Sequence, residues 1–152
     1  MPAIYATEQK FICPIATNKS YMAYIPAVVM AAGIAVVSLW ENPQMPETMQ
    51  MSDKLAHGVM YALLAVAWMV PISRQHAAIS IQCRARILPY IYVCALVTGY
   101  GALMEILQRF CTLTRSGEMA DLYADAIGAV TGVAIIGLFD FLKHLYFDKR
   151  ND

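Results

Sequence analysis

Acidic residues occur at helical spacing inside apolar stretches of this sequence, where an isolated charge is costly. Asp121 and Asp125 lie four residues apart and lead directly into glycines, alanines and aliphatic residues. Residues four apart share one face of a helix. Carboxylates gathered on such a face could act as general acids and bases, or could bind a divalent cation. The first question is therefore which groups surround these two aspartates.

Two further apolar segments carry polar residues in the same kind of pattern. Asp53, His57 and Tyr61 recur every four residues, and Glu105 and Gln108 share a face of another helix. The polar candidates taken together are Asp53, Lys54, His57, Tyr61, Glu105, Gln108, Arg109, Arg115, Asp121 and Asp125. Carboxylates suit Mg²⁺ or Mn²⁺, and a histidine ligand would add Zn²⁺. The spacing matches no recognised metal signature and no activated serine or cysteine stands out, so the catalytic residues, the metal and the cofactor stay undefined.

The composition shows which kind of chain positions these groups. Of 152 residues, 59% are hydrophobic and only 14% are charged, which is too apolar for a soluble domain of this length. Eleven basic and eleven acidic residues give zero net charge, so nothing indicates a nucleic-acid partner. The four cysteines show neither metal-ribbon spacing nor the density of a disulfide scaffold. The lipid bilayer is the expected environment.

The apolar stretches predict four membrane-spanning helices, because a span needs about 20 largely apolar residues. The expected helices cover residues 21–40, 53–73, 87–108 and 121–142. The first is free of charge and contains Pro26, which could kink it. The second and fourth reach bilayer length only by including the polar residues at their starts. The sequence therefore predicts an all-α integral membrane four-helix bundle, with an N-terminal arm at 1–20 and a tail at 143–152.

Basic residues favour cytoplasmic loops and so predict the orientation. Eight lie in the arm, in the loop between the second and third helices, and in the tail. Three, Lys54, Arg109 and Arg115, lie on the opposite side. Both termini are therefore expected in the cytoplasm. The starts of the second and fourth helices and the end of the third then meet at the external face, where their polar residues would form one cluster.

Some of these charges have simpler explanations. Asp53 and Asp121 lie in the first turn of their helices, where a carboxylate stabilises the positive end of the helix dipole. Asp140, near the cytoplasmic end, has Lys143 and His144 within helical reach and is expected to pair with them. Such roles are structural and involve no ligand.

The residues one turn deeper are harder to explain as surface charges. His57, Glu105 and Asp125 lie where an unpaired charge costs several kcal/mol, so each needs a partner. Tyr61 is expected to pack or to form a hydrogen bond. Ionisable residues within membrane helices are usually functional, which makes these deeper groups the main site candidates.

Small residues on the fourth predicted helix explain how aspartates can enter a membrane. Ala124, Gly128 and Gly132 are four apart, a pattern that lets two helices approach closely in lipid. The same face carries Asp121 and Asp125. Close packing along it would draw both carboxylates into the bundle, away from lipid.

Three segments resemble the signature regions of the VanZ-like family of small bacterial membrane proteins. They are "DKLAHGVMYALLAV" from Asp53, "EILQRF" from Glu105 and "RSGEMADLYADAIGAVTG" from Arg115. The family pattern is matched at Asp53, Lys54, His57, Glu105, Gln108, Arg115, Asp121 and Gly128. The sequence departs from it at Asp125, where the family often has Asn. The resemblance covers about two thirds of the chain and implies a multi-pass protein of the bacterial cytoplasmic membrane.

The family's founding member is associated with resistance to the glycopeptide teicoplanin, but no settled activity comes with the family name. One interpretation is a protein that binds an envelope lipid or cell-wall precursor, or whose cluster only locks the bundle. Its acidic groups could be balanced by the neighbouring Lys and Arg residues without a metal. The alternative is a metal- or carboxylate-dependent membrane hydrolase or transferase whose arginines bind a lipid-linked phosphate. Homo-oligomerisation is left open.

Overall fold

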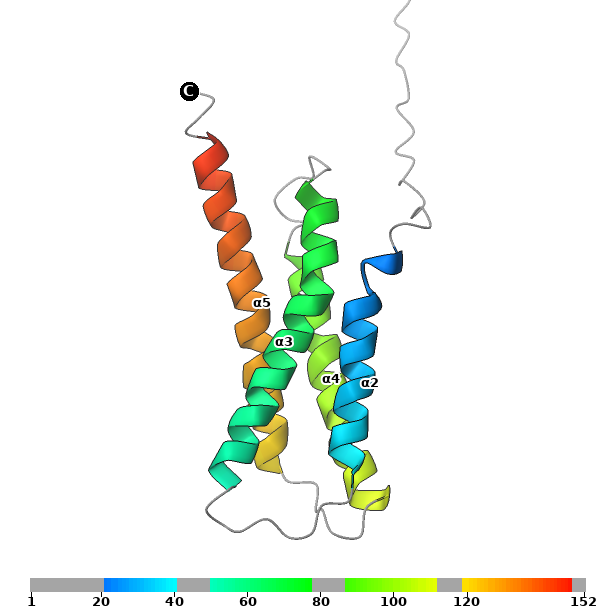
Figure 1. The fold of residues 1–152 in the computed structure, drawn as a ribbon. Helices are drawn as coiled ribbons and strands as arrows, with labels where there is room; N and C mark the ends of the chain where they lie inside the picture. The colour runs from blue at the N-terminus through cyan, green and yellow to red at the C-terminus, as the bar shows by residue number, and fades with distance from the viewer. Residues whose placement is uncertain (1–20, 41–49, 78–86, 112–118, 149–152) are drawn as a thin grey trace, which may run out of the picture.

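The computed structural model describes residues 21–40, 50–77, 87–111 and 119–148, and these residues are helical apart from short turns. They form four helices, α2 (Ile25–Leu39), α3 (Gln50–Ala77), α4 (Leu88–Cys111) and α5 (Met119–Asp148) (Figure 1). The all-α prediction is confirmed for these residues. The last three helices extend beyond the predicted 53–73, 87–108 and 121–142, so the predicted tail at 143–152 begins as helix.

Three helices are long and apolar enough to cross a membrane. The qualifying segments are Asp53–Gln75, Leu88–Cys111 and Met119–Tyr146. The fourth helix, α2, has 15 residues and is about 22 Å long at 1.5 Å per residue. It is therefore shorter than the hydrocarbon layer of about 30 Å. The sequence prediction of a full span over 21–40 differs from the structure in this respect.

Proline explains why α2 is short. Pro26 has no backbone N–H and is tolerated in the first turn of a helix, where that donor has no partner. It occupies this position in α2, which begins at Ile25. Tyr21 and Met22 before it are also helical, and a turn at residues 23–24 separates them from α2, with a 3.1 Å hydrogen bond from the Tyr24 N–H to the Tyr21 carbonyl. Pro26 thus lies in the first turn of α2, directly after the turn that interrupts the helical stretch predicted over 21–40.

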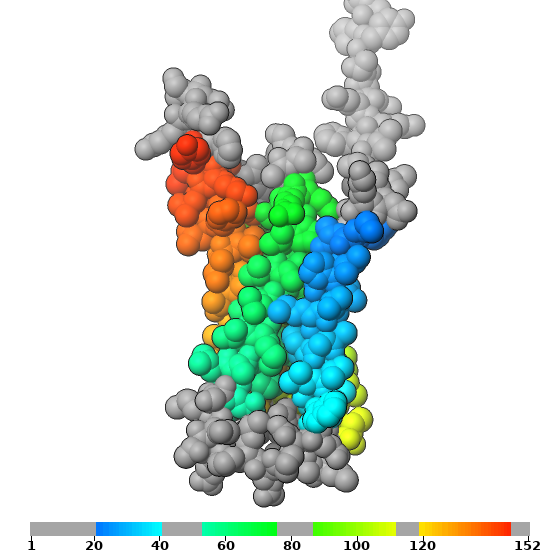
Figure 2. Space-filling model, in the orientation of Figure 1, coloured from blue at the N-terminus to red at the C-terminus, as the bar shows by residue number. Residues whose placement is uncertain are grey.

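The helices alternate in direction, which brings distant segments to the same end (Figure 1). The starts of α3 and α5 lie beside the ends of α2 and α4, and we call this the His57 end. The starts of α2 and α4 lie beside the ends of α3 and α5, and we call this the Asp140 end. Figure 2 shows α3 between α2 and α5 on the face in view. Every polar candidate within the described residues comes from the His57 half of its helix.

The closest packing joins α3 to α5, the pair with the most extensive contact. A Cβ atom added to Gly128 would overlap the Gly58 carbonyl oxygen, and one added to Gly132 would overlap the Ala62 carbonyl oxygen. A Cβ at Gly58 would lie 3.6 Å from the Ala124 carbonyl oxygen. The two backbones therefore touch along the small-residue face of α5. Only glycine at 128 and 132 permits this approach.

An apolar core fills the space between the helices. Its buried members are Ile34, Tyr61, Leu64, Ala65, Met69, Val93, Val97, Ala129 and Ile136. Two polar side chains of α4 attach α2 to this core. The Tyr100 hydroxyl donates to the Ala31 carbonyl at 2.6 Å, and the Gln108 amide donates to the Ser38 carbonyl at 3.0 Å. Ser38 lies in the last turn of α2, where backbone carbonyls lack helical partners, so Gln108 acts as a cap.

The outer surface of the helices is also apolar. Val29 of α2, Ile106 of α4 and Ile127 of α5 are each more than half exposed, as are many of their neighbours. A soluble monomer rarely exposes continuous apolar patches of this extent. Contact with lipid chains costs such a surface no free energy, whereas contact with water does. The exposed faces therefore agree with the three membrane-length helices.

Asp140 forms a second polar contact, at the opposite end from His57. Its carboxylate accepts hydrogen bonds of 2.7 Å from the Ser73 hydroxyl of α3 and from the Tyr90 hydroxyl of α4. The expected pairing of Asp140 with Lys143 and His144 is therefore wrong, because the carboxylate is hydrogen-bonded to hydroxyls of neighbouring helices instead. Lys143 instead lies 4.3 Å from the centre of the Phe139 ring. Asp140 joins three helices.

Candidate functional site

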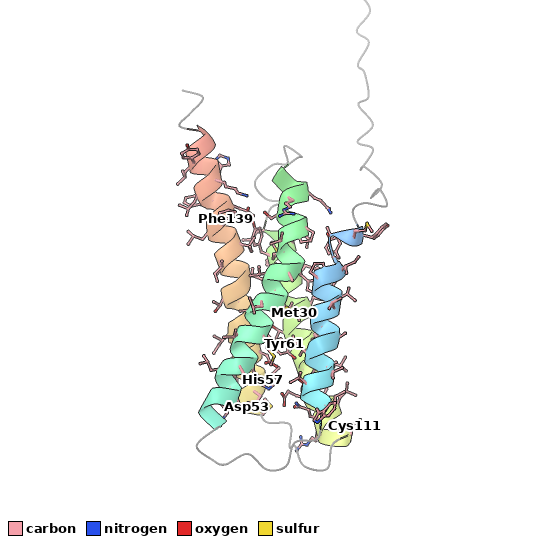
Figure 3. The ribbon with its side chains drawn as sticks, viewed as in Figure 1. Met30, Asp53, His57, Tyr61, Cys111 and Phe139 are labelled. Atoms are coloured by element: carbon pink, nitrogen blue, oxygen red, sulfur yellow. The ribbon has the colours of Figure 1, made fainter. Side chains whose placement is uncertain are left out.

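The His57 end contains a buried histidine–carboxylate pair. Asp53, His57 and Tyr61 follow one another along α3, as Figure 3 shows, because they recur every four residues. His57 Nδ1 lies 3.1 Å from Asp125 Oδ1 of α5. His57 is 4% exposed and Asp125 is fully buried. The contact links helices whose paired residues are 68 positions apart. The Asp125 side chain thus faces the space between the helices and not the outer surface.

A glycine on α4 makes room for this pair. A Cβ atom added to Gly101 would lie 2.7 Å from Asp125 Oδ2 and 3.1 Å from Cε1 of Tyr61. A side chain at this position would force the carboxylate to shift and would crowd the Tyr61 ring, so glycine leaves room for the carboxylate between α4 and α5. Sequence reasoning missed Gly101. Its position one turn before Glu105, on the same helix, was the available signal.

Glu105 completes a group of three buried ionisable residues. It is 8% exposed and comes from α4. One ligand atom from each of His57, Glu105 and Asp125 lies within 4.8 Å of the other two. We call these three residues the buried triad. Each of the three membrane-length helices therefore contributes one member.

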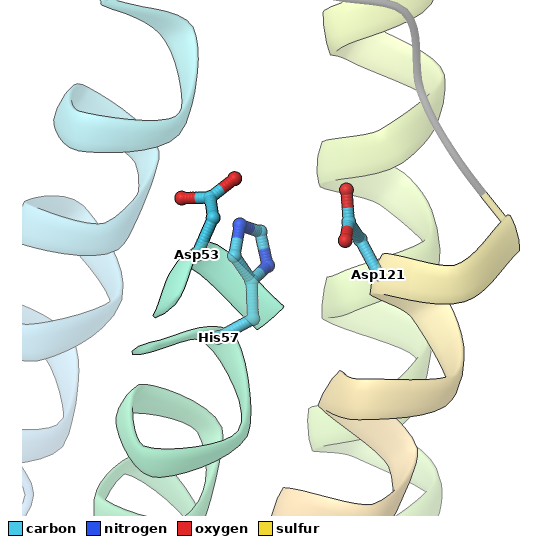
Figure 4. A group of neighbouring side chains, drawn as sticks. All are labelled: Asp53, His57 and Asp121. Carbon is cyan, nitrogen blue, oxygen red and sulfur yellow. The ribbon is translucent and has the colours of Figure 1, made fainter. Parts of the chain in front are cut away.

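Two half-buried aspartates lie around the same histidine. Figure 4 shows the His57 ring between the carboxylates of Asp53 and Asp121. One ligand atom from each of these three residues also lies within 4.8 Å of the others. We call Asp53 and Asp121 the acidic rim. Both also lie in the first turn of a helix, so the favourable interaction with the helix dipole applies to them as well.

Tyr61 lies one turn deeper than His57 on α3. Its ring is parallel to the imidazole within 9°, with centroids 6.4 Å apart, and it also contacts Tyr100. The side chain is fully buried. Its hydroxyl makes no hydrogen bond to any other described residue. Tyr61 therefore packs as expected, but it leaves a buried polar group without a protein partner in the described part of the chain.

The remaining candidates are not all drawn into the cluster. Gln108 is buried but donates to the Ser38 carbonyl of α2. Arg109 is exposed. Lys54 is half-buried and has an interaction partner, and Arg115 lies outside the described residues.

The charge balance expected from the sequence set Lys54, Arg109 and Arg115 against the acidic groups. Of these, Lys54 is half-buried and Arg109 is exposed. The buried triad itself contains two carboxylates and one imidazole. Within the described residues, the site is therefore rich in hydrogen-bond acceptors and in negative charge. Such a site is suited to ligands that donate hydrogen bonds or carry positive charge.

Comparisons with protein-family models, curated proteins and solved structures found no match to this chain. The chemistry of the site therefore has to be argued from its own residues.

Proposed function

We propose that this chain is a VanZ-like, multi-pass protein of the bacterial cytoplasmic membrane that binds an envelope lipid or cell-wall precursor at its His57 end. In this proposal the four helices form one membrane bundle. The observation that carries it is the meeting of the buried triad and the acidic rim at one end of three membrane-length helices. Ionisable groups held inside such helices usually serve a ligand or a reaction.

The level of the site in the membrane favours a lipid headgroup as the ligand. Asp121 and Asp140 are 19 residues apart on α5, which is about 28 Å along a helix and close to the thickness of the hydrocarbon layer. The acidic rim therefore lies where headgroups begin if Asp140 marks the other boundary. Acyl chains can cover the exposed apolar faces of the helices beside it.

The hydrogen-bonding groups of the acidic rim indicate which kinds of headgroup could bind there. Carboxylates at Asp53 and Asp121 only accept hydrogen bonds when ionised, so they complement amines and sugar hydroxyls. Cell-wall precursors and amino lipids carry such donors. The family's association with teicoplanin resistance is consistent with a precursor ligand, and resistance itself is an association of the family.

Orientation is the first testable part of this proposal. We expect both termini in the cytoplasm and the His57 end outside, because eight of eleven basic residues lie on the side of the termini. Single cysteines at Gln44 and Gln75, in a chain lacking its native cysteines, can be labelled in intact cells with a membrane-impermeant maleimide. Gln44→Cys should react and Gln75→Cys should react only after lysis. The reverse pattern would place the His57 end in the cytoplasm.

Lipid retention tests the binding function. The full chain is purified from bacterial membranes in a mild detergent and its retained lipids are identified by native mass spectrometry. We expect one headgroup class to be retained, and Asp121→Asn to lower its retention about tenfold, equivalent to about 1.4 kcal/mol. Asp140→Asn is the matched control, because it makes the same chemical change at the other end. Equal retention by both variants would contradict binding at the His57 end.

The His57–Asp125 pair supports a second candidate, a membrane hydrolase or transferase. A carboxylate that orients an imidazole is the arrangement found in many general bases. The same mass spectra separate the two candidates when wild type is incubated with vesicles of total bacterial envelope lipids. A binder returns each lipid at its original mass. An enzyme returns a product of altered mass, and His57→Ala abolishes that change.

A further inference from the structure

We propose that His57, Glu105 and Asp125 bind one divalent transition-metal cation between α3, α4 and α5. The site takes one imidazole nitrogen and two carboxylate oxygens, a donor set that suits Zn²⁺ or Mn²⁺. This inference goes beyond lipid recognition, and it stands whether or not the acidic rim binds a headgroup.

The distances between the ligand atoms fit a single ion. Ligands on opposite sides of an ion, each about 2.1 Å from it, are about 4.2 Å apart, and neighbouring ligands are about 3 Å apart. The triad's ligand atoms lie within 4.8 Å of one another, and His57 Nδ1 lies 3.1 Å from Asp125 Oδ1. Small changes of the side-chain torsion angles would bring these atoms to coordination distance.

Asp125 provides an independent sign of a missing partner. Its side chain is fully buried, and Oδ2 makes no hydrogen bond to any other described residue. The oxygen lies in the space that Gly101 leaves open on α4, one helical turn before Glu105. A buried carboxylate oxygen without a donor costs several kcal/mol, whereas a bound cation satisfies it.

Charge supports the same ligand. Two carboxylates, those of Glu105 and Asp125, are buried beside one imidazole. The acidic rim lies on the outer side of His57, within 4.8 Å of its ligand atoms (Figure 4). Negative charge at the rim would draw a cation from solution toward the buried triad. The three helices then share an ion that holds them together.

Metal content after reconstitution tests the site directly. The full chain, purified with an affinity tag that contains no histidine, is stripped with EDTA and dialysed against Zn²⁺ or Mn²⁺ in separate samples. Elemental analysis should give close to one ion per chain for at least one of them. Asp125→Asn, Glu105→Gln and His57→Ala should each lower the affinity at least tenfold. Asp140→Asn, which changes a half-buried acid at the other end, should retain the ion.

The melting temperature, measured with and without the ion, shows whether a variant that binds no ion is still folded. Adding the bound ion should raise the melting temperature of stripped wild type and of Asp140→Asn, because a ligand that binds only the folded state stabilises it. The same addition should raise the melting temperatures of the three triad variants less. Absence of ion from wild type, or full retention by all three triad variants, would overturn the proposal.

Metal binding and lipid binding can be tested separately. Lipid retention measured in EDTA and metal content measured in lipid-free detergent report on the two ligands one at a time. Loss of lipid without loss of metal contradicts only the proposed function. Loss of metal without loss of lipid contradicts only the metal site.

Discussion

Replacing His57 with alanine in metal-free protein should lower the free energy of unfolding by about 3 kcal/mol. His57 Nδ1 is the hydrogen-bond partner of Asp125 Oδ1 within the buried triad. Without it, a fully buried carboxylate keeps no described partner at either oxygen. Unfolding in mixed detergent micelles with excess EDTA measures this loss without any contribution from a bound ion.

A double-mutant cycle with Asp125→Ala tests whether the loss in His57→Ala comes from the Asp125 carboxylate that is left without its partner. Once His57 is absent, changing Asp125 to alanine removes the stranded carboxylate and also lowers the negative charge near Glu105. We therefore expect the double variant to be at least as stable as His57→Ala alone. The stability losses of His57→Ala and Asp125→Ala, added together, should exceed the loss of the double variant by about 2 kcal/mol. Residues in one network do not contribute additively.

Two comparisons make the mutant cycle decisive. His57→Ala combined with Gly99→Ala should be additive, because a Cβ at Gly99 meets no other atom within 4 Å. Additivity in the His57–Asp125 cycle as well would mean that the two side chains do not interact. Asp125→Asn should lose less stability than Asp125→Ala, because the amide oxygen can still accept from His57.

Gly128→Ala should lower the free energy of unfolding by about 3 kcal/mol, or abolish recovery of folded protein, although it adds only one methyl group. The added Cβ would overlap the Gly58 carbonyl oxygen, which is backbone and cannot rotate away. The helices α3 and α5 would have to separate along their seam. The same separation would pull Asp125 of α5 away from His57 of α3.

Gly99→Ala is the matched control, on a helix surface with open space. Alanine is a better helix former than glycine by about 1 kcal/mol, so this variant should be unchanged or slightly more stable. The two substitutions should therefore have opposite signs. Detergent-phase melting and gel filtration measure both. Equal tolerance at 99 and 128 would remove the case for close α3–α5 contact.

Much of the fold follows from local patterns in the sequence. Apolar stretches of sufficient length predict three of the helices. Two of these helices also include the polar residues before the apolar stretch, since Asp53 lies within α3 and Asp121 within α5. The continuous helix predicted over 21–40 differs from the structure, where a turn at residues 23–24 interrupts it, because Pro26 can serve a helix start as well as a kink. Local sequence could not choose between these two roles.

The site was only partly predictable. Helical spacing placed Asp53, His57 and Tyr61 on one face, and the alternating direction of the predicted helices placed Glu105 at the same end. It could not show that Gln108 donates to the Ser38 carbonyl of α2.

Two other long-range features escaped the sequence. The Gly101 space for Asp125 was not expected, and Asp140 was assigned to the wrong partners. Each of these contacts joins residues on different helices, and a pattern within one helix carries no information about its neighbour.

The sequence by itself determined which segments are helical, how long most of them are and which face of each is polar. These properties depend on residues three or four apart, within one helix. Only the tertiary structure decided that His57 Nδ1 meets Asp125 Oδ1 and that Glu105 joins them. The reason is physical: the backbone contact at Gly128 and Gly132 sets the distance between α3 and α5, and with it which polar atoms come within reach of one another.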